Sequence, residues 1–358
     1  MATSIPLDAV GEDALFVALR RYWHPVAFAD DLGADPVAAT LLEEPLVLVR
    51  LDGEPVAMHD LCIHRGTPLS LGEVVDDQLR CAYHGWTYDA SGRCTRIPAR
   101  HGSTIPAKAR VDRYRTAEHA GLIWVCLDDD PAMPLPTFPE ADDPAYRKVR
   151  IPTYDWASSA ARRVENFVDF SHFPFVHRGV LGDPDRPEIP DHEVVRDATS
   201  LRFALGLEEP ANPLKADDPD AETIQRDPTD YVLTMPFTAY LNQPLPDAHH
   251  FVLFVASSPT TRDTCRSFSF CARNYDLDPS KDDEYVGFQE VVLEQDRRVV
   301  EAQRPEELPI DLAAELHVRG VDRVSIEYRR WLGEIAATAR DGEPVNAASP
   351  TGTGSPRS

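Results

Sequence analysis

The sequence predicts an α+β protein, in which a small all-β unit precedes a larger unit of mixed strands and helices. Short β-rich runs and tight turns dominate the chain up to about residue 130. The segment DDDPAMPLPTFPEADDP follows, and its density of proline and acid is typical of a linker. Beyond it, β-rich runs occur together with long stretches of helical periodicity, which predicts a second, mixed unit.

The predicted elements follow in chain order. Residues 46–59 (LVLVRLDGEPVAMH) predict a hairpin, because two β-rich runs flank the tight-turn pair Asp52-Gly53. The run GLIWVCL at 121–127 predicts a buried strand. In the second half we expect three strands and three helices, with the strands at 231–234, 251–256 and 266–272 and the helices at 160–172, 284–303 and 322–337.

These elements divide the chain into five expected segments. They are an N-terminal segment (1–45) that packs on the second domain, a β-domain (46–130), a linker (131–150), a mixed second domain (151–340) and a tail (341–358). The tail, DGEPVNAASPTGTGSPRS, has the composition of a disordered end.

Composition excludes several classes of function. Hydrophobic residues make up 42% of the 358, which is enough for a sizeable core. The net charge of −24 opposes binding to nucleic acid. No apolar run is long enough to cross a bilayer, and the N-terminus lacks the features of a signal peptide, so we expect a cytoplasmic protein without membrane contact. Six cysteines in a chain of this length are not a disulfide framework.

The charge is unevenly distributed. Residues 62–120 contain nine Lys/Arg and six Asp/Glu, a local net charge of +3 on an otherwise acidic chain. This basic segment can be a docking face for an acidic partner, with Arg65, Arg93 and Arg96 as candidates. Ordinary variation in a loop-rich segment explains the same numbers equally well.

Two cysteines and two histidines form the first constellation. Cys62-x-His64 is separated by sixteen residues from Cys81-x-x-His84. Structural zinc sites usually pair Cys with Cys and His with His, whereas here each half supplies one of each. That pairing suits a [2Fe–2S] cluster with two thiolates on one iron and two imidazoles on the other. The following glycines allow the backbone to come close to the sulfurs. The alternatives are a zinc knuckle or coincidence.

The second constellation is ENFVDFSHFPFVHR at 165–178. Asp169 and His172 are three residues apart and would share a helix face, and His177 follows beyond Pro174. In the predicted helix 284–303, Asp296 is the one charged member of an apolar stripe that comprises Tyr285, Phe288, Val292, Asp296 and Val299. His172, His177 and Asp296 would form a 2-His-1-carboxylate site for Fe(II). The alternatives are satisfied core histidines and an Asp296 that pairs with an arginine.

With both motifs in this order, the chain resembles the α-subunit of Rieske non-haem iron oxygenases, in particular the α-only group of vanillate O-demethylase and phthalate-type enzymes. The resemblance spans about residues 15–335, and the family motif N-x-x-D-x-x-H-x4-H is present from Asn166 to His177. It implies a Rieske β-domain followed by a helix-grip (START-like) catalytic domain with an antiparallel sheet. One local departure is Gln295, where relatives often carry an acid; the three expected ligands are unaffected.

The resemblance also implies the cofactors, the partners and the reaction. The cofactors would be a Rieske [2Fe–2S] cluster on Cys62, His64, Cys81 and His84, and a mononuclear Fe(II) on His172, His177 and Asp296. A ferredoxin or flavin reductase would reduce the cluster. Asp169, with Asn166 beside it, would bridge to the neighbouring subunit's cluster, at His84, in a head-to-tail homotrimer. O₂ and these electrons would hydroxylate or oxidatively demethylate an aromatic or related ring.

Substrate identity is the least determined part of the interpretation. The candidate pocket residues are the aromatic and polar side chains Phe167, Phe170, Phe237, Tyr240, Asn242, His250 and Phe251, each of which can equally be core. One alternative function is a cis-dihydroxylating dioxygenase α-subunit. Another is a non-catalytic Rieske electron carrier, although such proteins are about a hundred residues long and lack a second metal motif. A degenerate binding protein would require a broken triad.

Overall fold

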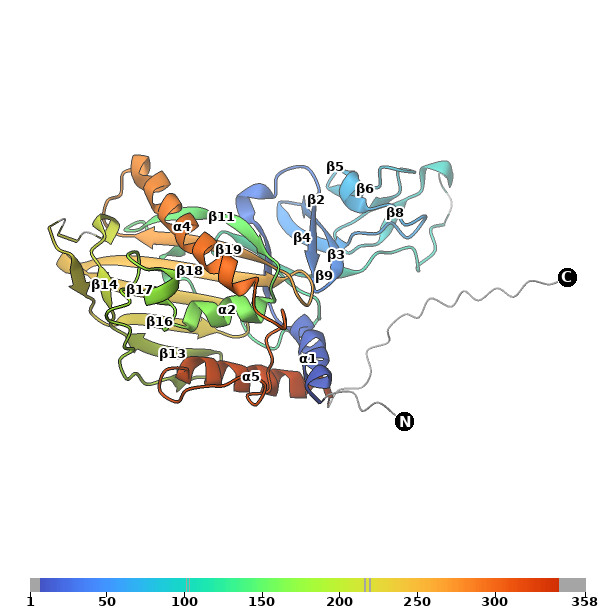
Figure 1. The fold of residues 1–358 in the computed structure, drawn as a ribbon. Helices are drawn as coiled ribbons and strands as arrows, with labels where there is room; N and C mark the ends of the chain where they lie inside the picture. The colour runs from blue at the N-terminus through green and yellow to red at the C-terminus, as the bar shows by residue number, and fades with distance from the viewer. Residues whose placement is uncertain (1–6, 101, 103, 216, 219, 341–358) are drawn as a thin grey trace, which may run out of the picture.

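The computed structural model describes residues 7–100, 102, 104–215, 217–218 and 220–340. The predicted disordered tail, 341–358, lies outside the described residues. Two units are visible, a smaller one from the N-terminal part of the chain and a larger one that contains most of the helices (Figure 1). The expected α+β class, with an all-β unit first, is confirmed.

The N-terminal unit contains two antiparallel sheets. Its six-stranded sheet has the order β1-β10-β9-β4-β3-β2 and comprises β1 (His24–Phe28), β2 (Val37–Leu41), β3 (Glu44–Leu51), β4 (Glu54–His59), β9 (Arg113–His119) and β10 (Leu122–Cys126). The four-stranded sheet comprises β5 (Glu73–Val75), β6 (Gln78–Arg80), β7 (Thr87–Tyr88) and β8 (Cys94–Arg96). The predicted hairpin is confirmed as β3 and β4, and the predicted buried strand is confirmed as β10.

The first 45 residues are shared between the two units. Strands β1 and β2 belong to the six-stranded sheet, so this sheet begins before the boundary expected at residue 46. Helix α1 (Leu7–Ala18) instead packs against α5 (Arg323–Arg340) of the larger unit. Within the expected segment 1–45, α1 packs on α5 and β1 also contacts β18 and β19 of the larger unit, although β1 and β2 are strands of the six-stranded sheet.

The larger unit is built on a seven-stranded antiparallel sheet. The strand order is β11-β19-β18-β17-β16-β13-β12, with β11 (Arg147–Trp156), β12 (Val195–Arg196), β13 (Ser200–Leu205), β16 (Thr229–Thr234), β17 (Thr238–Leu245), β18 (His249–Pro259) and β19 (Cys265–Arg273). A small hairpin joins β14 (Glu208–Pro210) to β15 (Thr223–Gln225). The helices are α2 (Ala160–Val168), α3 (Phe173–Val176), α4 (Asp282–Val300) and α5. Short 3₁₀ turns lie at Leu19–Arg21, Ala29–Asp31, Leu69–Leu71, Pro98–Arg100, Pro139–Ala141, Pro213–Lys215, Pro246–Ala248 and Pro279–Lys281.

The predicted strands of the second half lie within β16, β18 and β19, and the two late helices correspond to α4 and α5. The helix predicted over 160–172 ends at Val168 instead. Asp169 has extended backbone angles, and its Oδ1 accepts hydrogen bonds from the Ser171 amide (2.9 Å) and hydroxyl (2.6 Å). A short acidic side chain that bonds the backbone two residues on competes with helix continuation. Asp169 and His172 therefore do not share a helix face.

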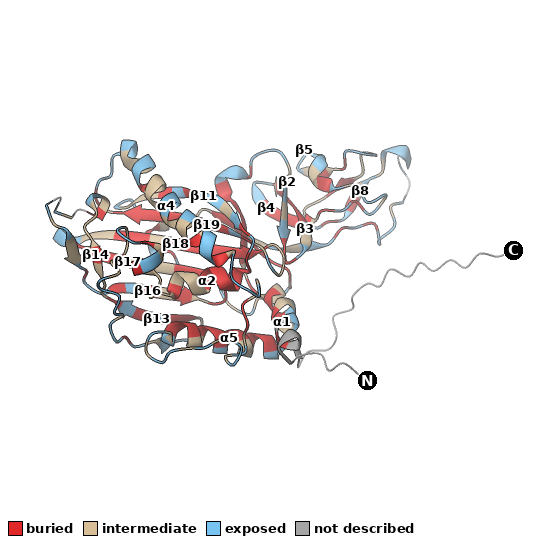
Figure 2. Cartoon of the chain, viewed as in Figure 1, coloured by how far each residue is buried: buried red, intermediate tan, exposed pale blue. Residues whose placement is uncertain are grey.

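The two faces of the seven-stranded sheet have different neighbours. Helices α2 and α4 cross one face, as Figure 1 shows for the green and orange helices. The other face packs on the N-terminal unit and the linker, through an aromatic cluster that includes Phe28, Trp124, Phe138, Phe254 and Phe268. Buried residues accordingly continue from the central strands into the junction between the units (Figure 2). No helix in the described part of the chain is long and apolar enough to span a bilayer.

We expect Trp124→Ala to lower the free energy of unfolding by about 3–5 kcal/mol, because a large buried side chain leaves a cavity. Trp124 has no exposed surface, and its indole N–H donates to the His119 carbonyl at 3.0 Å. Urea unfolding followed by circular dichroism measures the change. Leu316→Ala, at a side chain that is 93% exposed, is the matched control and should change stability by less than about 0.5 kcal/mol. An equal effect of both substitutions would contradict the packing described.

Candidate iron and iron–sulfur sites

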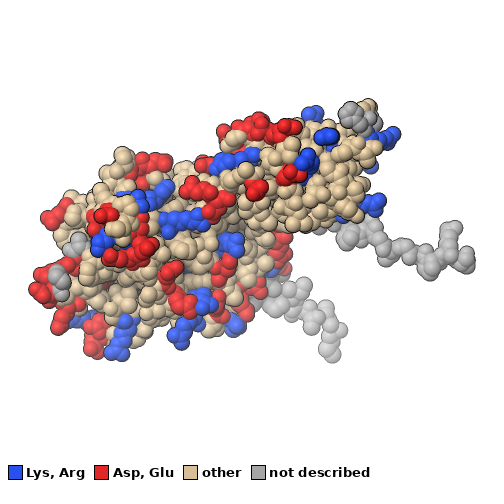
Figure 3. Space-filling view, turned by 90° about the horizontal axis from the view of Figure 1, so that it is seen from above, with Lys and Arg blue, Asp and Glu red and all other residues tan. Residues whose placement is uncertain are grey.

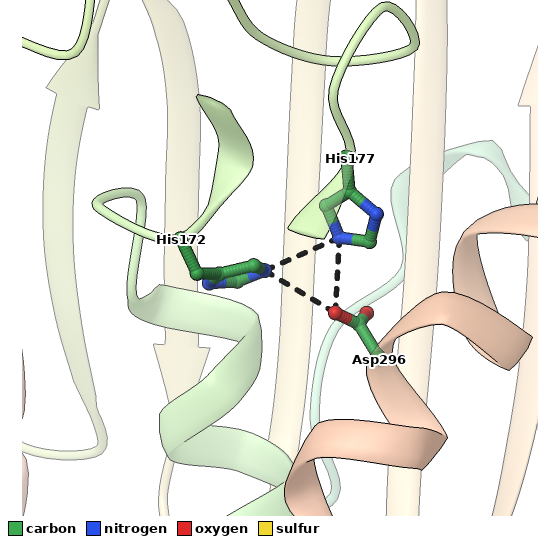
Figure 4. A group of neighbouring side chains, drawn as sticks. All are labelled: His172, His177 and Asp296. Atoms are coloured by element: carbon green, nitrogen blue, oxygen red, sulfur yellow. Dashed lines mark hydrogen bonds and ion pairs between the residues drawn. The ribbon is translucent and has the colours of Figure 1, made fainter. Parts of the chain in front are cut away.

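Three side chains from two separate segments converge on one point. His172 and His177 flank the short helix α3, and Asp296 projects from α4 (Figure 4). The Nε2 atoms of the histidines are 3.2 Å apart, and they lie 3.2 Å (His172) and 2.9 Å (His177) from Asp296 Oδ1. Each residue offers one nitrogen or oxygen ligand atom, and His177 and Asp296 are buried. This donor set fits a divalent metal ion with open coordination positions.

Electrostatics favours a cation at this point. Burial alone would raise the pKa of Asp296, but the hydrogen bonds from His172 and His177 outweigh it and hold that pKa well below its usual range. Burial would lower the pKa of His172, but the carboxylates of Asp169 and Asp296 raise it to about 9. Without a metal, the positive charge favoured on His172 thus balances the carboxylate. A metal ion supplies the same positive charge and also uses the ring lone pairs.

Two of the three predicted ligands, Asp296 and His177, are each held by a further side chain. Asn166 Nδ2 donates to Asp296 Oδ1 at 3.2 Å, and Arg163 Nη1 donates to Asn166 Oδ1 at 3.2 Å. His177 Nδ1 donates to Gln295 Oε1 at 2.8 Å, which leaves Nε2 as the nitrogen directed at the ligand point. Sequence reasoning noted Gln295 only as a departure from the family pattern, and the structure places it in direct contact with a predicted ligand.

The apolar stripe predicted on the helix that carries Asp296 is partly wrong. Tyr285 and Asp296 are buried as expected, but Val299 is 48% exposed. The buried positions of α4 are Tyr285, Gln289, Asp296 and Val300. The spacing of these positions is close to whole helical turns of 3.6 residues, so they lie on one face of α4. This buried face includes Gln289, and Val299 lies outside it. Phe288 and Val292 are half-buried and line the cavity described next.

A cavity with about 840 Å³ of empty space, part of it open to solvent, adjoins the triad, and all three predicted ligands line it. Of the seven predicted pocket residues, Phe167 and Phe251 line this cavity. Strand β17 turns Leu241 and Gln243 toward the cavity, so the alternate residues point to the opposite face of the sheet.

The other five predicted pocket residues make contacts elsewhere. Tyr240 donates from its hydroxyl to Glu140 Oε1 at 2.8 Å, and His250 Nδ1 donates to the side-chain oxygen Oδ1 of Asn242 at 2.7 Å. Phe237 packs on His24, with ring centroids 5.9 Å apart. Phe170 packs on Tyr231 in the core, with centroids 5.0 Å apart, and borders a separate hollow.

Several lining residues were missed by sequence reasoning. They are polar or aromatic and include Arg163, Glu209, Lys215, Tyr231, Gln243 and Gln289. Period-two alternation within TAYLNQPL could have identified Gln243 as a neighbour of Leu241 on one face. Glu209 lies in the three-residue strand β14 and Lys215 in a three-residue 3₁₀ turn, and elements this short carry no periodic signal.

Asp169 lies between the triad and the surface. Its side chain is 37% exposed, and Oδ2 is 3.5 Å from His172 Nδ1. It borders a hollow that is also lined by Glu165, Asn166, Val299 and Gln303. The carboxylate is therefore placed to contact one predicted metal ligand from outside the cavity.

The Cys/His motifs form two loops of matching geometry in the N-terminal unit. The Gly66 amide donates to the Cys62 carbonyl at 2.9 Å, and the Gly85 amide donates to the Cys81 carbonyl at 3.0 Å. Both glycines have positive φ (71° and 67°), so each closes a tight turn that a Cβ would strain. Burial raises the pKa of the Cys81 thiol, and the backbone N–H groups of Tyr83 and His84 act in the opposite direction.

Side chains of the two loops are arranged to hold a cluster. Cys62 and Cys81 are buried, and the Tyr88 hydroxyl lies 3.1 Å from the Cys62 sulfur. The ring centroids of His64 and His84 are 4.5 Å apart, and the ring of His64 stacks on that of Trp86. Nδ1 of His64 is buried and has no hydrogen-bond partner among the described residues, so it is available to a metal. Two thiols and two imidazoles on facing loops fit a [2Fe–2S] cluster.

Comparisons with known proteins identify a family for each unit. The Rieske [2Fe-2S] domain family matches residues 22–115, and the vanillate O-demethylase oxygenase C-terminal domain family matches residues 156–338. The chain is 38% identical over 337 residues to methylxanthine N1-demethylase NdmA of Pseudomonas putida, and the aligned part covers 90% of this chain and 91% of the relative. It is 35% identical over 336 residues to methylxanthine N3-demethylase NdmB of the same organism, with the same coverage.

Solved structures give the same result. The structure of Pseudomonas putida NdmA with caffeine superimposes with a TM-score of 0.81 at 37% identity and covers 92% of this chain and 94% of the other. Dicamba monooxygenase bound to dicamba has a TM-score of 0.76 at 23% identity, covers 90% and 99%, and shares the fold.

We expect Gln295→Leu to weaken Fe(II) binding roughly 10–100-fold, because partners of ligating histidines typically contribute that much to metal affinity. The leucine keeps the volume but removes the acceptor for His177 Nδ1. Competition with a chelator measures the affinity, and the visible spectrum monitors the cluster separately. Gln295→Glu keeps an acceptor and should retain iron. Unchanged iron affinity in the leucine variant would show that the contact is dispensable.

Proposed function

The chain belongs to the Rieske non-haem iron oxygenases, and we propose that it removes an N-methyl group from an uncharged, carbonyl-bearing heterocycle of the methylxanthine type. Members of this family accept electrons from ferredoxin or reductase partners and act on small molecules with O₂. They contain a [2Fe–2S] Rieske cluster and a mononuclear non-haem iron. The proposal narrows that activity to one reaction and one class of ring.

The neutral charge balance of the cavity is the observation that carries the proposal. Two cationic side chains line the cavity, and each already has a partner. Lys215 pairs with Glu209 at 2.6 Å. Arg163 donates hydrogen bonds to Asn166 and Tyr154, and the negative charge of Asp296 also attracts it. A benzoate or sulfonate would need an unpaired cation beside it. The relatives NdmA and NdmB are named for methylxanthines, which are uncharged rings.

The residues of this chain would position the methyl group and exclude water. His172, His177 and Asp296 would hold iron, which supplies O₂ activation when bound. Phe167, Phe251 and other apolar side chains pack on the ring faces and limit entry of water. In the net reaction the N-methyl group, O₂, two electrons and two protons give the N–H compound, formaldehyde and water. Hydroxylation of the methyl carbon and loss of formaldehyde account for every atom.

The electrons would reach the iron across a subunit contact. The second Cys/His loop belongs to the four-stranded sheet. In the same chain, this sheet lies far from helices α2 and α4 (Figure 1). Asp169 faces outward beside His172. We infer that Asp169 contacts a cluster histidine, corresponding to His84, of a neighbouring copy in a homotrimer, and that Asn166 keeps Asp296 oriented. A carboxylate that accepts from an imidazole N–H is the usual arrangement around a metal ligand.

We expect the chemically reduced, iron-replete protein to convert caffeine in a single turnover with about one formaldehyde released per substrate consumed. Matched O-methyl ethers with a carboxylate, such as dicamba, should react far more slowly, because the cavity offers no free cation. A formaldehyde assay and mass spectrometry with ¹⁸O₂ measure both products. A product that carries one labelled oxygen on the ring, formed without formaldehyde, would show ring hydroxylation and not demethylation. Two labelled oxygens on the ring would show dihydroxylation.

The docking face for the electron donor gives a second prediction. Arg65 and Arg96 are exposed on the N-terminal unit, whereas Arg93 pairs with Asp89 at 3.2 Å. Basic side chains lie around the end of this unit, while acidic and basic ones alternate over the larger unit (Figure 3). We propose that an acidic ferredoxin or flavin reductase docks there.

Reversing the charge in Arg65→Glu/Arg96→Glu should slow reduction of the cluster by such a donor roughly tenfold at low salt, with a smaller effect at high salt. Stopped-flow absorbance measures the rate. Single turnover of chemically reduced protein should not change, and Arg319→Glu, on an exposed residue of the larger unit, is the control. A reduction rate equal to that of the wild type would rule out this docking face.

A further inference from the structure

Four charged side chains are buried together at one end of the β14–β15 hairpin. Lys215 Nζ lies 2.6 Å from Glu209 Oε2, and Arg226 Nε lies 3.1 Å from the same oxygen. Arg226 also forms a bidentate pair with Asp217. Glu209, Lys215 and Arg226 are 7%, 6% and 4% exposed. The group contains two acids and two bases, so its net charge is zero.

Only one side of this group borders the cavity. Glu209 and Lys215 line it together with the iron-ligand triad, whereas Arg226 and Asp217 lie behind them. Buried ion pairs seldom stabilise a fold more than apolar side chains of the same volume would. A buried ammonium at the wall of a substrate cavity therefore indicates recognition of a ligand.

The ion pair with Glu209 leaves hydrogen-bond donors on Lys215 for a ligand. Burial would raise the pKa of Glu209, but Lys215 and Arg226 outweigh it and lower that pKa, so the carboxylate stays ionised. The ammonium group has three N–H donors. One is used in the bond to Glu209, which leaves two for an acceptor in the cavity.

Beside Lys215 the cavity wall has a polar corner, made of Glu209, Lys215 and Gln243, next to the aromatic ring of Phe251. Gln243 Nε2 lies 3.5 Å from Glu209 Oε1, and Gln243 pairs across the sheet with Phe251 of β18. Both of these side chains line the cavity. An aromatic face beside an amide and an ammonium is complementary to a flat ring that carries an acceptor oxygen on its edge.

We propose that Lys215, oriented by Glu209, donates a hydrogen bond to a ring carbonyl oxygen of the substrate, with Gln243 as a second polar contact. Lys215 is thus a specificity-determining residue that selects oxo-heterocycles over carbonyl-free rings of the same shape. This inference rests on the proposed function, because it concerns the cavity in which demethylation occurs. A site built to bond a substrate oxygen rejects analogues that lack it more strongly than an apolar pocket rejects a change of size.

The test compares two neutral bicyclic probes in the iron-replete protein, 1,3-dimethylbenzimidazol-2-one, which has a carbonyl, and 1-methylbenzimidazole, which has none. Caffeine is a third probe. Lys215→Met keeps the length of the side chain and removes its donors. We expect binding of caffeine and of the carbonyl probe to weaken roughly 10–100-fold, the usual contribution of a hydrogen bond to a charged group. Binding of 1-methylbenzimidazole should not weaken. Calorimetry measures binding, and the formaldehyde assay measures kcat/KM for the same probes.

Two further variants separate recognition from folding. Glu209→Gln/Lys215→Met removes the pair without leaving a new unpaired charge and should show the same selective loss. Lys281→Met removes the lysine of an exposed pair with Glu284 and should change nothing. Thermal unfolding monitors stability in all of them. Equal loss of both ring types, or loss of neither, would overturn the role of Lys215 while leaving demethylation intact. If the wild-type protein releases formaldehyde from none of the probes, the proposed function fails and this inference with it.

Discussion

The arrangement of the larger unit depends on one buried charge, the carboxylate of Asp296. An ionised carboxylate that is 6% exposed costs several kcal/mol unless it is paired. Its nearest partners, His172 and His177, come from the irregular segment that follows α2, so that segment is positioned against α4 by the need to neutralise the charge. Asn166 on α2 completes the contact. The early end of α2 at Val168 makes this possible, because a continued helix would carry His172 along a different face.

The cavity follows from strand alternation and from the helices that cover one face of the sheet. Inward-facing residues of β16, β17 and β18 form its floor, and α2 and α4 form its sides. The opposite face of the same strands packs on Phe138 and Trp124, so the N-terminal unit supports the floor from below. A substitution at this junction therefore acts on the substrate cavity through the sheet. The polar corner at Lys215 comes from the hairpin that lies beside these strands.

The fold was predicted where local signals and tertiary packing agree. The turn Asp52-Gly53 has positive φ at both residues, as a tight hairpin requires, and the run at 122–126 is entirely buried. Strand β11 was missed because RKVRIPTYDW contains Pro152 and four charged residues, and its pairing with β19 is interrupted by a register shift after Ile151. Strand β1 was missed because its partner in the sheet, β10, is distant in the sequence. Strand β2 pairs with the next strand, β3, but the turn between them is Leu42-Glu43, which is not a typical turn pair although both residues have positive φ.

The predicted metal ligands lie together in the structure, whereas most of the predicted pocket residues do not line the cavity, and the two outcomes have the same physical reason. Metal ligands are fixed by chemistry that only Cys, His and acidic residues supply at particular spacings, so His172 and Cys62 could be singled out without knowledge of the fold. A pocket wall has no such constraint, because Tyr240 and Leu241 differ by one position and face opposite sides of the sheet. Sequence reasoning selected aromatic residues by type. The structure shows that side-chain direction decides which residues reach the cavity, and that direction is set by register with neighbouring strands.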